Sequence, residues 1–592
     1  MTAKLTRRTF VSASAAVLAG LGLAACGGNG SGTNNAAQGN DVTGTEPASG
    51  SPATTDLTKL PLPEKGKVYT NPKSRDEIKD GGTLNLSASE IGPDFNQYNI
   101  NGNTTYMKYF WQLYMPLFPF KQSADGGTFT PDPNFIDSIE TTEESGKEVC
   151  TIKIADKATF NDGTPIDWRA YESVWKSCSG QNADYTPAMT DGYQQIESVK
   201  AGATDKECVI TFSTPYYPVE SIISFLHPDA AADAETFNNG FNNNPHNEWG
   251  AGPFAVDTFD QTQITFKRNP KWWGDEAKLE SIVYKQMDSQ AMYNAFKNGE
   301  IDATEPGATG SSEMLSNFAG MDSAEIRRAN SISIANIEIN STRDSMKDIN
   351  VRKAFAQCLD VPTILSIVYQ GVNWSEERIG SLLCCQWQDG YENNLPDDIT
   401  ANSDAESEIA AAKKTLEDAG YEMGSDGYYA KDGQQVAFSF TTFGDSNVTK
   451  NRAAAIQKMC KDAGMNLTID NHPGSEFSKT LTSGNWDTVL FAWSAGSASY
   501  NNGGQIYGSE SSSNFTHLGN AELDAKFAAV CGIADHAEQM KAVNEAEKEA
   551  LKSYGFIPVF CGADVVVAKK GLANFGPCLL ETPSPENYGW EK

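Results

Sequence analysis

One stretch, from Trp249 to Gly274, constrains the fold most strongly; it reads WGAGPFAVDTFDQTQITFKRNPKWWG. It begins with two glycines and a proline, which predict a tight turn with an unusual backbone conformation. Apolar and polar residues then alternate on either side of Asp260-Gln261, which predicts two strands joined by a short turn. Asn269-Pro270 ends the second strand. The expected inward-facing side chains are Phe254, Val256, Ile264 and Phe266.

The first 26 residues have the features of an export signal. Basic residues at positions 4, 7 and 8 precede an apolar run over residues 10–23, which is too short to span a membrane as a stable helix. The sequence LAAC at 23–26 has the pattern of a bacterial lipobox and predicts that Cys26 becomes the lipidated N-terminus. The pair Arg7-Arg8 also fits a twin-arginine signal, so the general secretory and twin-arginine routes both stay open.

Charge and composition extend this prediction to the rest of the chain. Residues 27–80 are rich in Gly, Ser, Thr, Asn and Pro without an apolar period, which predicts a flexible tether. The formal net charge of −31 argues against nucleic acid or an anionic membrane face as a partner. We therefore expect an exported protein that is anchored by lipid to the outer face of the cytoplasmic membrane.

The cysteines and histidines give little sign of a chemical site. Without Cys26 ten of the 11 cysteines remain, an even number for an oxidising compartment. Cys150 and Cys208 each open a β-like run, so a disulfide between them is possible if the two strands are neighbours. The five histidines lack ligand spacing and no C-x-x-C occurs, so we expect no metal and no cofactor. No G-x-S-x-G, H-E-x-x-H or Cys/His pattern appears in the folded part, and no catalytic residue is predicted.

Further segments follow the glycine-rich stretch at wide intervals. YNAFKNGEID at 293–302 predicts a helix that ends at a glycine, followed by a strand. DINVRKAFAQCLD at 348–360 predicts a helix with one apolar face, and AAKKTLEDAGY at 411–421 predicts a helix closed by glycine. SGNWDTVLFAW at 483–493 predicts a turn and a strand, and IPVF at 557–560 predicts another strand.

In this order the segments resemble those of the family 5 solute-binding proteins, the peptide and oligopeptide receptors of ABC importers. The resemblance spans residues 81–590 and implies an α/β fold of the two-lobed periplasmic-binding-protein type (class II, Venus-flytrap) with an extra subdomain. It places lobe I at 81–115, 246–335 and 555–592, with the strand at 557–560 returning to this lobe. The inserted subdomain would take 116–245, and lobe II 336–554.

The resemblance also implies a function. It describes a monomeric, non-enzymatic lipoprotein that encloses a short peptide by closure about a hinge and delivers it to the membrane subunits of an ABC permease. Motif positions place ligand contacts at Thr104, Tyr106, Trp387, Trp493, Ser494 and Asn514. Thr104 or Thr105 would also serve as a helix N-cap, and the capping and ligand-binding roles are compatible.

Two charged residues in the matching segments have simpler explanations than a ligand site. Asp162-Gly163 predicts a turn in which the glycine takes a positive φ. Arg352 could bind an anionic group of a ligand, but a structural ion pair at the base of lobe II explains it better.

The class of ligand is open. In peptide receptors of the family an acid a few positions after the last tryptophan of the 483–493 segment often binds the ligand's amino terminus, whereas SAGSASY at 494–500 contains no acid. Trp387 and Trp493 could stack on sugar rings as well as contact peptide side chains. The alternatives are therefore an oligosaccharide or other non-peptide solute, an exported hydrolase, and a sensor or carrier with this fold but no permease.

Overall fold

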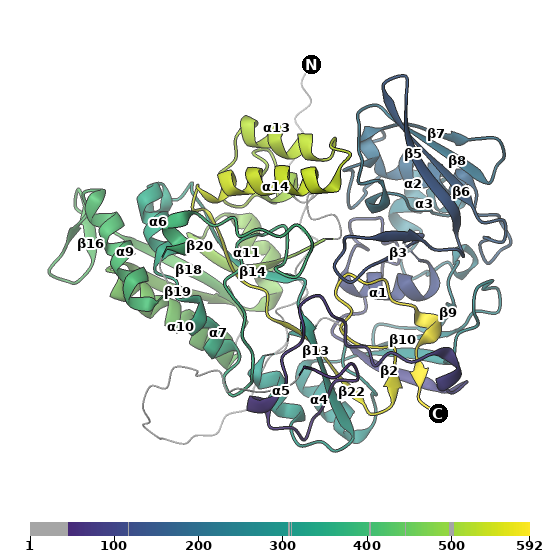
Figure 1. The fold of residues 1–592 in the computed structure, drawn as a ribbon, viewed down its shortest axis with the longest axis horizontal. Helices are drawn as coiled ribbons and strands as arrows, with labels where there is room; N and C mark the ends of the chain where they lie inside the picture. Colours follow the sequence, from purple (N-terminus) through teal and green to yellow (C-terminus); the bar gives the residue numbers. More distant parts are fainter. Residues whose placement is uncertain are drawn as a thin grey trace.

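The computed structural model describes residues 45–116, 118–305, 308–309, 311–401, 404–444, 446–496 and 503–592. The predicted signal peptide and Cys26 lie outside these residues. The described chain forms two lobes side by side, with lobe II on the left of Figure 1 and lobe I with its inserted subdomain on the right. In these ranges no helix is long and apolar enough to cross a membrane.

Lobe I contains two four-stranded sheets. The first has the order β2-β11-β10-β9, formed by β2 (Thr83–Ala88), β9 (Phe254–Phe259), β10 (Gln263–Arg268) and β11 (Ser281–Gln286). The second has the order β1-β13-β22-β12, formed by β1 (Ser51–Pro52), β12 (Ala308–Thr309), β13 (Ala324–Asn330) and β22 (Ala563–Lys569). Ala303 joins the sheets, because it bridges to Leu86 of β2 and to Ala568 of β22.

The glycine-rich stretch folds as predicted, but its glycines are needed for a different reason. β9 and β10 form the expected antiparallel hairpin, and its four predicted inward side chains are buried. Gly250 has an ordinary φ of −69°. A Cβ on Gly252 would lie only 2.5 Å from the carbonyl oxygen of Leu113, so close packing against the helix α1 (Thr105–Tyr114) excludes any side chain.

The inserted subdomain is an antiparallel sheet with helices on it. Its order is β5-β6-β8-β7, formed by β5 (Ile136–Glu144), β6 (Lys147–Ile154), β7 (Ile196–Ala201) and β8 (Glu207–Phe212). The helices are α2 (Trp168–Cys178), which packs on β7 and β8, and the short α3 (Ala234–Asn239). Gly163 lies in the predicted turn with φ +95°. Asp162 accepts a hydrogen bond there from the backbone of Thr164.

The structure does not contain the disulfide between Cys150 and Cys208. Their strands are neighbours, as that pairing requires, but the register sets Cys150 opposite Ile210 and Cys208 opposite Ile152. The two cysteines are therefore two positions apart along the ladder, and both thiols are free.

Lobe II contains a five-stranded sheet of order β19-β18-β20-β14-β21. Its strands are β14 (Ser333–Ile339), β18 (Ala437–Phe443), β19 (Asn466–His472), β20 (Thr488–Ser494) and β21 (Phe556–Phe560). Its longer helices are α6 (Ile349–Gln357), α7 (Val361–Val368), α9 (Ala405–Asp418), α10 (Asn447–Asp462), α13 (Ala521–Val530) and α14 (His536–Leu551). The predicted apolar face of α6 is confirmed, since Val351 and Phe355 are buried.

The remaining helices and strands complete the fold. The helices are α1 (Thr105–Tyr114), α4 (Ser289–Asn298), α5 (Ser312–Phe318), α8 (Asp397–Thr400), α11 (Phe477–Ser483) and α12 (Gly503–Tyr507). The strands are β3 (Phe120–Gln122), β4 (Phe129–Pro131), β15 (Glu422–Met423), β16 (Tyr429–Lys431), β17 (Gln434–Gln435), β23 (Leu572–Ala573) and β24 (Gly589–Trp590).

The tether predicted to reach residue 80 is shorter in the structure. β1 pairs with β13, and Ala53, Leu60 and Ile78 are fully buried. Glu46 forms a buried ion pair with Arg328. Apolar side chains in this polar segment pack one at a time on lobe I, so no apolar period marks them in the sequence.

Two segments of the described chain cross between the sheets of the lobes and form the hinge. β13 of lobe I continues through Ser331 and Ile332 into β14 of lobe II, and β21 of lobe II continues through Cys561 and Gly562 into β22 of lobe I. The Ser331 N–H donates to the Gly562 carbonyl oxygen at 3.0 Å. The prediction that residues 557–560 return to lobe I is wrong, because β21 pairs with β14 and the return comes only at β22.

Candidate ligand-binding site

On lobe I the edge beside the hinge is formed by strand ends. β2 ends at Ala88 and runs parallel to the segment through Ala303, so both reach the same edge. β12 follows this segment and pairs with Val565 and Asp564, which come directly after the hinge. In open α/β sheets ligands bind beyond the carboxyl ends of the strands. This edge is therefore the lobe I side of the candidate cleft.

On lobe II the corresponding edge is the end of β20. Ser494 ends this strand, is exposed, and lies opposite Ser333, which begins β14 directly after the hinge. The next N–H, that of Ala495, donates to the carbonyl oxygen of Ile332 in the hinge. The ends of the lobe I strands and the end of β20 thus lie on either side of the same two crossing segments.

Tyr106 is the centre of a hydrogen-bond network on the lobe I edge. Its hydroxyl accepts from the Ser89 N–H at 2.9 Å, lies 2.7 Å from Ser89 Oγ, and donates to a carboxylate oxygen of Glu305. The Glu305 carboxylate also accepts from the Ser89 N–H at 3.0 Å, and the Glu305 N–H donates to Ser87 Oγ at 3.0 Å. Burial raises the pKa of Glu305 to about 7, and the backbone hydrogen bond from Ser89 opposes this shift.

Two further polar residues, Thr104 and Lys108, lie at the start of α1 near Tyr106 in the sequence. Thr104 is the N-cap of α1, where its hydroxyl accepts from the Met107 N–H at 3.2 Å, so the capping role is confirmed. The Lys108 side chain is exposed, yet desolvation lowers its pKa.

Trp387 lies against the hinge. Its indole N–H donates to the Ser331 carbonyl oxygen at 3.1 Å, and its side chain is buried. Nearby, the Glu376 carboxylate accepts from the N–H groups of Cys561 and Gly562 at 2.7 and 2.8 Å. These contacts hold both crossing segments against lobe II, so Trp387 helps to fix the hinge as well as lying near the cleft.

Trp493 lies over a buried acid that the sequence did not single out. Its indole N–H donates to Glu338 Oε1 at 2.8 Å. Glu338 is fully buried, and its Oε2 has no hydrogen-bond partner among the described residues. Burial raises the pKa of Glu338 to about 8, while the hydrogen bond from Trp493 opposes the shift.

Asn514 does not present its side chain to the cleft. Its amide nitrogen donates to the carbonyl oxygens of Tyr507 and Gly508, and its Oδ1 accepts from the N–H and hydroxyl of Thr516. The side chain is buried and its polar atoms are used within the loop, so we assign it a structural role. Arg352 likewise donates to three backbone carbonyl oxygens at the base of lobe II, which explains it without a ligand.

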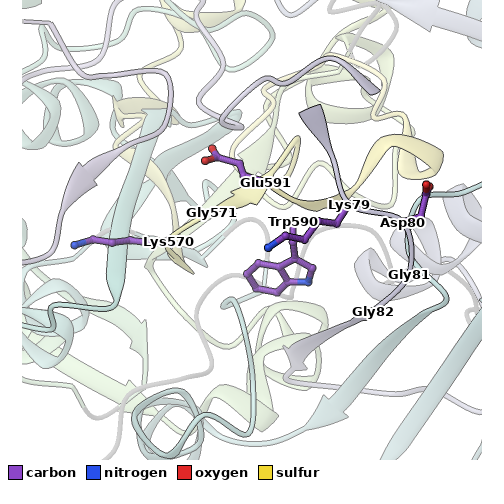
Figure 2. A pocket seen from close by; sticks show the side chains of 8 residues that line it. All are labelled: Lys79, Asp80, Gly81, Gly82, Lys570, Gly571, Trp590 and Glu591. Carbon is purple, nitrogen blue, oxygen red and sulfur yellow. The ribbon is translucent and has the colours of Figure 1, made fainter. Parts of the chain in front are cut away.

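A separate hollow lies on lobe I beside the C-terminal strand β24. Figure 2 shows that the indole ring of Trp590 forms part of its wall. It contains none of the predicted contact residues and is lined by Lys79, Asp80, Gly81, Gly82, Lys570, Gly571, Trp590 and Glu591. Over the described ranges no group of three or more His, Cys, Asp or Glu side chains is placed to hold a metal ion.

Two α/β lobes, a pair of crossing strands and polar strand ends on both sides define the class of hinged binding proteins. Residues 130–515 match the model of the family described as bacterial extracellular solute-binding proteins, family 5. The chain belongs to this family and is a solute-binding protein.

Relatives with this architecture have several ligands. The chain is 30% identical over 508 residues to the oligopeptide-binding protein OppA of Mycobacterium tuberculosis, which covers 84% of this chain and 83% of the relative. The solved structure of the periplasmic EDTA-binding protein EppA matches with a TM-score of 0.80 and 21% identity, over 89% of this chain and all of the other. That of AppA from Bacillus subtilis with a nonapeptide matches with a TM-score of 0.69 and 18% identity, over 87% and 100%. The structural matches show the fold.

Proposed function

We propose that this protein captures short peptides in extended conformation by closure of its two lobes, and delivers them to an ABC permease. The observation that carries the proposal is the unpaired end of β20 beside the hinge, where Ala492 is partly exposed and Ser494 is exposed. β18 pairs with β20 at Thr488 and Val489 alone. Among the described strands none pairs with residues 490–494 on that side.

A free strand edge at a cleft suits a peptide better than other solutes. An extended peptide can add to the edge as a further strand, so that affinity comes from main-chain hydrogen bonds that every peptide can make. Ser494 at the exposed end of this edge lies opposite Ser333, the first residue of β14 after the hinge. The 30% identical relative named as an oligopeptide-binding protein supports the same ligand class.

Closure of the lobes is supported by a contact remote in sequence from both hinge segments. The Tyr217 N–H of the inserted subdomain donates to the carbonyl oxygen of Cys531 at the end of α13, at 2.9 Å. Figure 1 shows α13 and α14 reaching from lobe II towards the inserted subdomain. A ligand that contacts both lobes would favour this closed arrangement over an open one.

The site of action follows from the N-terminal segment. We propose that Cys26 carries a lipid that anchors a monomeric protein to the outer face of the cytoplasmic membrane, where it meets the membrane subunits of its permease. The protein itself catalyses no reaction.

Mass spectrometry of co-purified ligand tests the proposal. The chain from residue 27 onward keeps every described residue, and its bound material can be released by denaturation. We expect a mixture of short peptides of varied sequence. A single glycan, chelate or other small molecule would contradict the peptide ligand and leave the solute-binding role in place.

A further inference from the structure

We propose that Glu305 is a ligand-binding carboxylate that holds a positively charged group of the ligand, which for a peptide is its amino terminus. This inference rests on the peptide-binding function proposed above. Residues 494–500 contain no acid that could bind the ligand's amino terminus, and Glu305 would take this role from lobe I.

The position of Glu305 fits this role. It comes two residues after Ala303, which joins the two sheets of lobe I, and just before β12, which pairs with the first residues after the hinge. Its side chain is partly exposed, and its partner Ser89 is exposed at the end of β2. The carboxylate therefore lies at the edge where the strands of lobe I end.

The hydrogen-bond partners of Glu305 orient its carboxylate without neutralising it. They are the hydroxyl of Tyr106 and the backbone N–H of Ser89, both of which are uncharged donors. No Lys, Arg or His side chain of the described residues contributes to its electrostatic environment. A desolvated carboxylate is stabilised either by a proton or by a cation such as Arg328, which pairs with Glu46, so a cationic group of a ligand could take the place of the proton on Glu305.

Three other desolvated carboxylates, at Glu338, Glu376 and Glu547, are unsuited to the same task. Glu338 and Glu547 are sealed within lobe II. Glu547 in addition accepts from the Leu382 N–H and the Tyr507 hydroxyl. Glu376 is occupied by two N–H groups of the hinge. Glu305 differs because it is partly exposed at the edge of the cleft.

A competition experiment measures the contribution of the ligand's amino group. The chain from residue 27 onward is equilibrated with a mixed-sequence pentapeptide library with free amino termini and the same library after N-acetylation. The retained peptides are counted by mass spectrometry. We expect about tenfold preference for the free amine, equivalent to about 1.4 kcal/mol. Retention of both libraries without preference would overturn the inference alone, whereas retention of neither would overturn the peptide-binding function as well.

Substitutions assign the preference to one side chain. Glu305→Gln keeps the size and an acceptor oxygen but removes the charge, and we expect it to bind both libraries equally. Glu305→Asp keeps the charge and should keep part of the preference. Glu90→Gln, an exposed residue of the same lobe, is the matched control and should keep all of it. A preference that survives in a folded Glu305→Gln variant, with thermal unfolding as the check of folding, would overturn the inference.

Discussion

The two sides of the cleft contain similar groups in different surroundings. On lobe I the hydroxyl of Tyr106 donates to Glu305, and on lobe II the indole of Trp493 donates to Glu338. Both carboxyl groups have a pKa raised by burial, to about 7 and about 8. Glu305 is partly exposed, whereas Glu338 is fully buried. The comparison teaches that a raised pKa does not by itself mark a binding group, because access decides whether a ligand or the fold uses the carboxylate.

The largest expected effect concerns the sealed carboxyl group. The folded-state pKa of Glu338, about 8, is above the ordinary value of 4.5, so the folded protein loses stability as pH rises from 4.5 through 8. Glu338→Gln does not titrate, and its stability relative to wild type should therefore improve by about 2–4 kcal/mol between pH 4.5 and pH 9. Urea unfolding of both proteins across this range measures the difference. A difference that does not change with pH would show that Glu338 has an ordinary pKa.

The second effect concerns Trp493, whose indole N–H donates to Glu338. Trp493→Phe removes the indole donor and leaves a buried carboxyl group without a hydrogen bond, which should cost about 2 kcal/mol of unfolding free energy. It should also move the pH-dependent loss of stability to higher pH. Trp486→Phe is the matched control, because that buried indole donates to the backbone oxygen of Leu481. It should destabilise the protein without moving the pH profile.

The third effect concerns the open carboxyl group. Binding of a cationic ligand requires Glu305 to be ionised, so affinity should fall as pH falls below the pKa of about 7. We expect about tenfold weaker binding of the free-amine peptide library at pH 5.5 than at pH 7. Glu305→Gln should show no such loss. An equal pH dependence in both proteins would assign the titration to another group.

The smallest effect concerns the partner of Glu305. Tyr106→Phe removes one donor, but the Ser89 N–H and solvent still reach this carboxylate, so the loss of stability should be at most about 1 kcal/mol. A loss as large as that of Trp493→Phe, measured by urea unfolding, would show that the lobe I network is as sealed as that of lobe II.

The sequence predicted the helices and strands themselves better than the sheet or lobe that each one joins. The β9–β10 hairpin and the apolar face of α6 were predicted because alternation and helical spacing are local patterns. The sequence did not predict the lobe to which β21 belongs. All five residues of this strand are buried, and nothing in FIPVF indicates which sheet they join. The packing of isolated side chains from residues 45–80 on lobe I was also missed, since such side chains leave no apolar period in the sequence.

The candidate site shows the same limit. Thr104, Tyr106, Trp387, Trp493 and Ser494 were predicted by motif. In the structure Thr104 caps α1, Tyr106 bonds to the end of β2, Trp387 bonds to the hinge, and Trp493 and Ser494 lie in β20. Glu305 could not be identified from the sequence, because it is one of 77 acidic residues. Only the fold shows that it is partly desolvated without a cationic partner among the described residues. Asn514 matched a motif, but its amide is used within its own loop.

The hydrogen bond between Tyr217 and Cys531 has a consequence for recognition outside the cleft. It joins the inserted subdomain to the end of α13, two surfaces that belong to different lobes and would separate if the lobes opened. A membrane partner that spans this junction would find one uninterrupted surface on a loaded protein and two separated surfaces on an empty one. The partner would then distinguish a ligand-bound protein from a ligand-free one by the shape of its surface, without contacting the ligand.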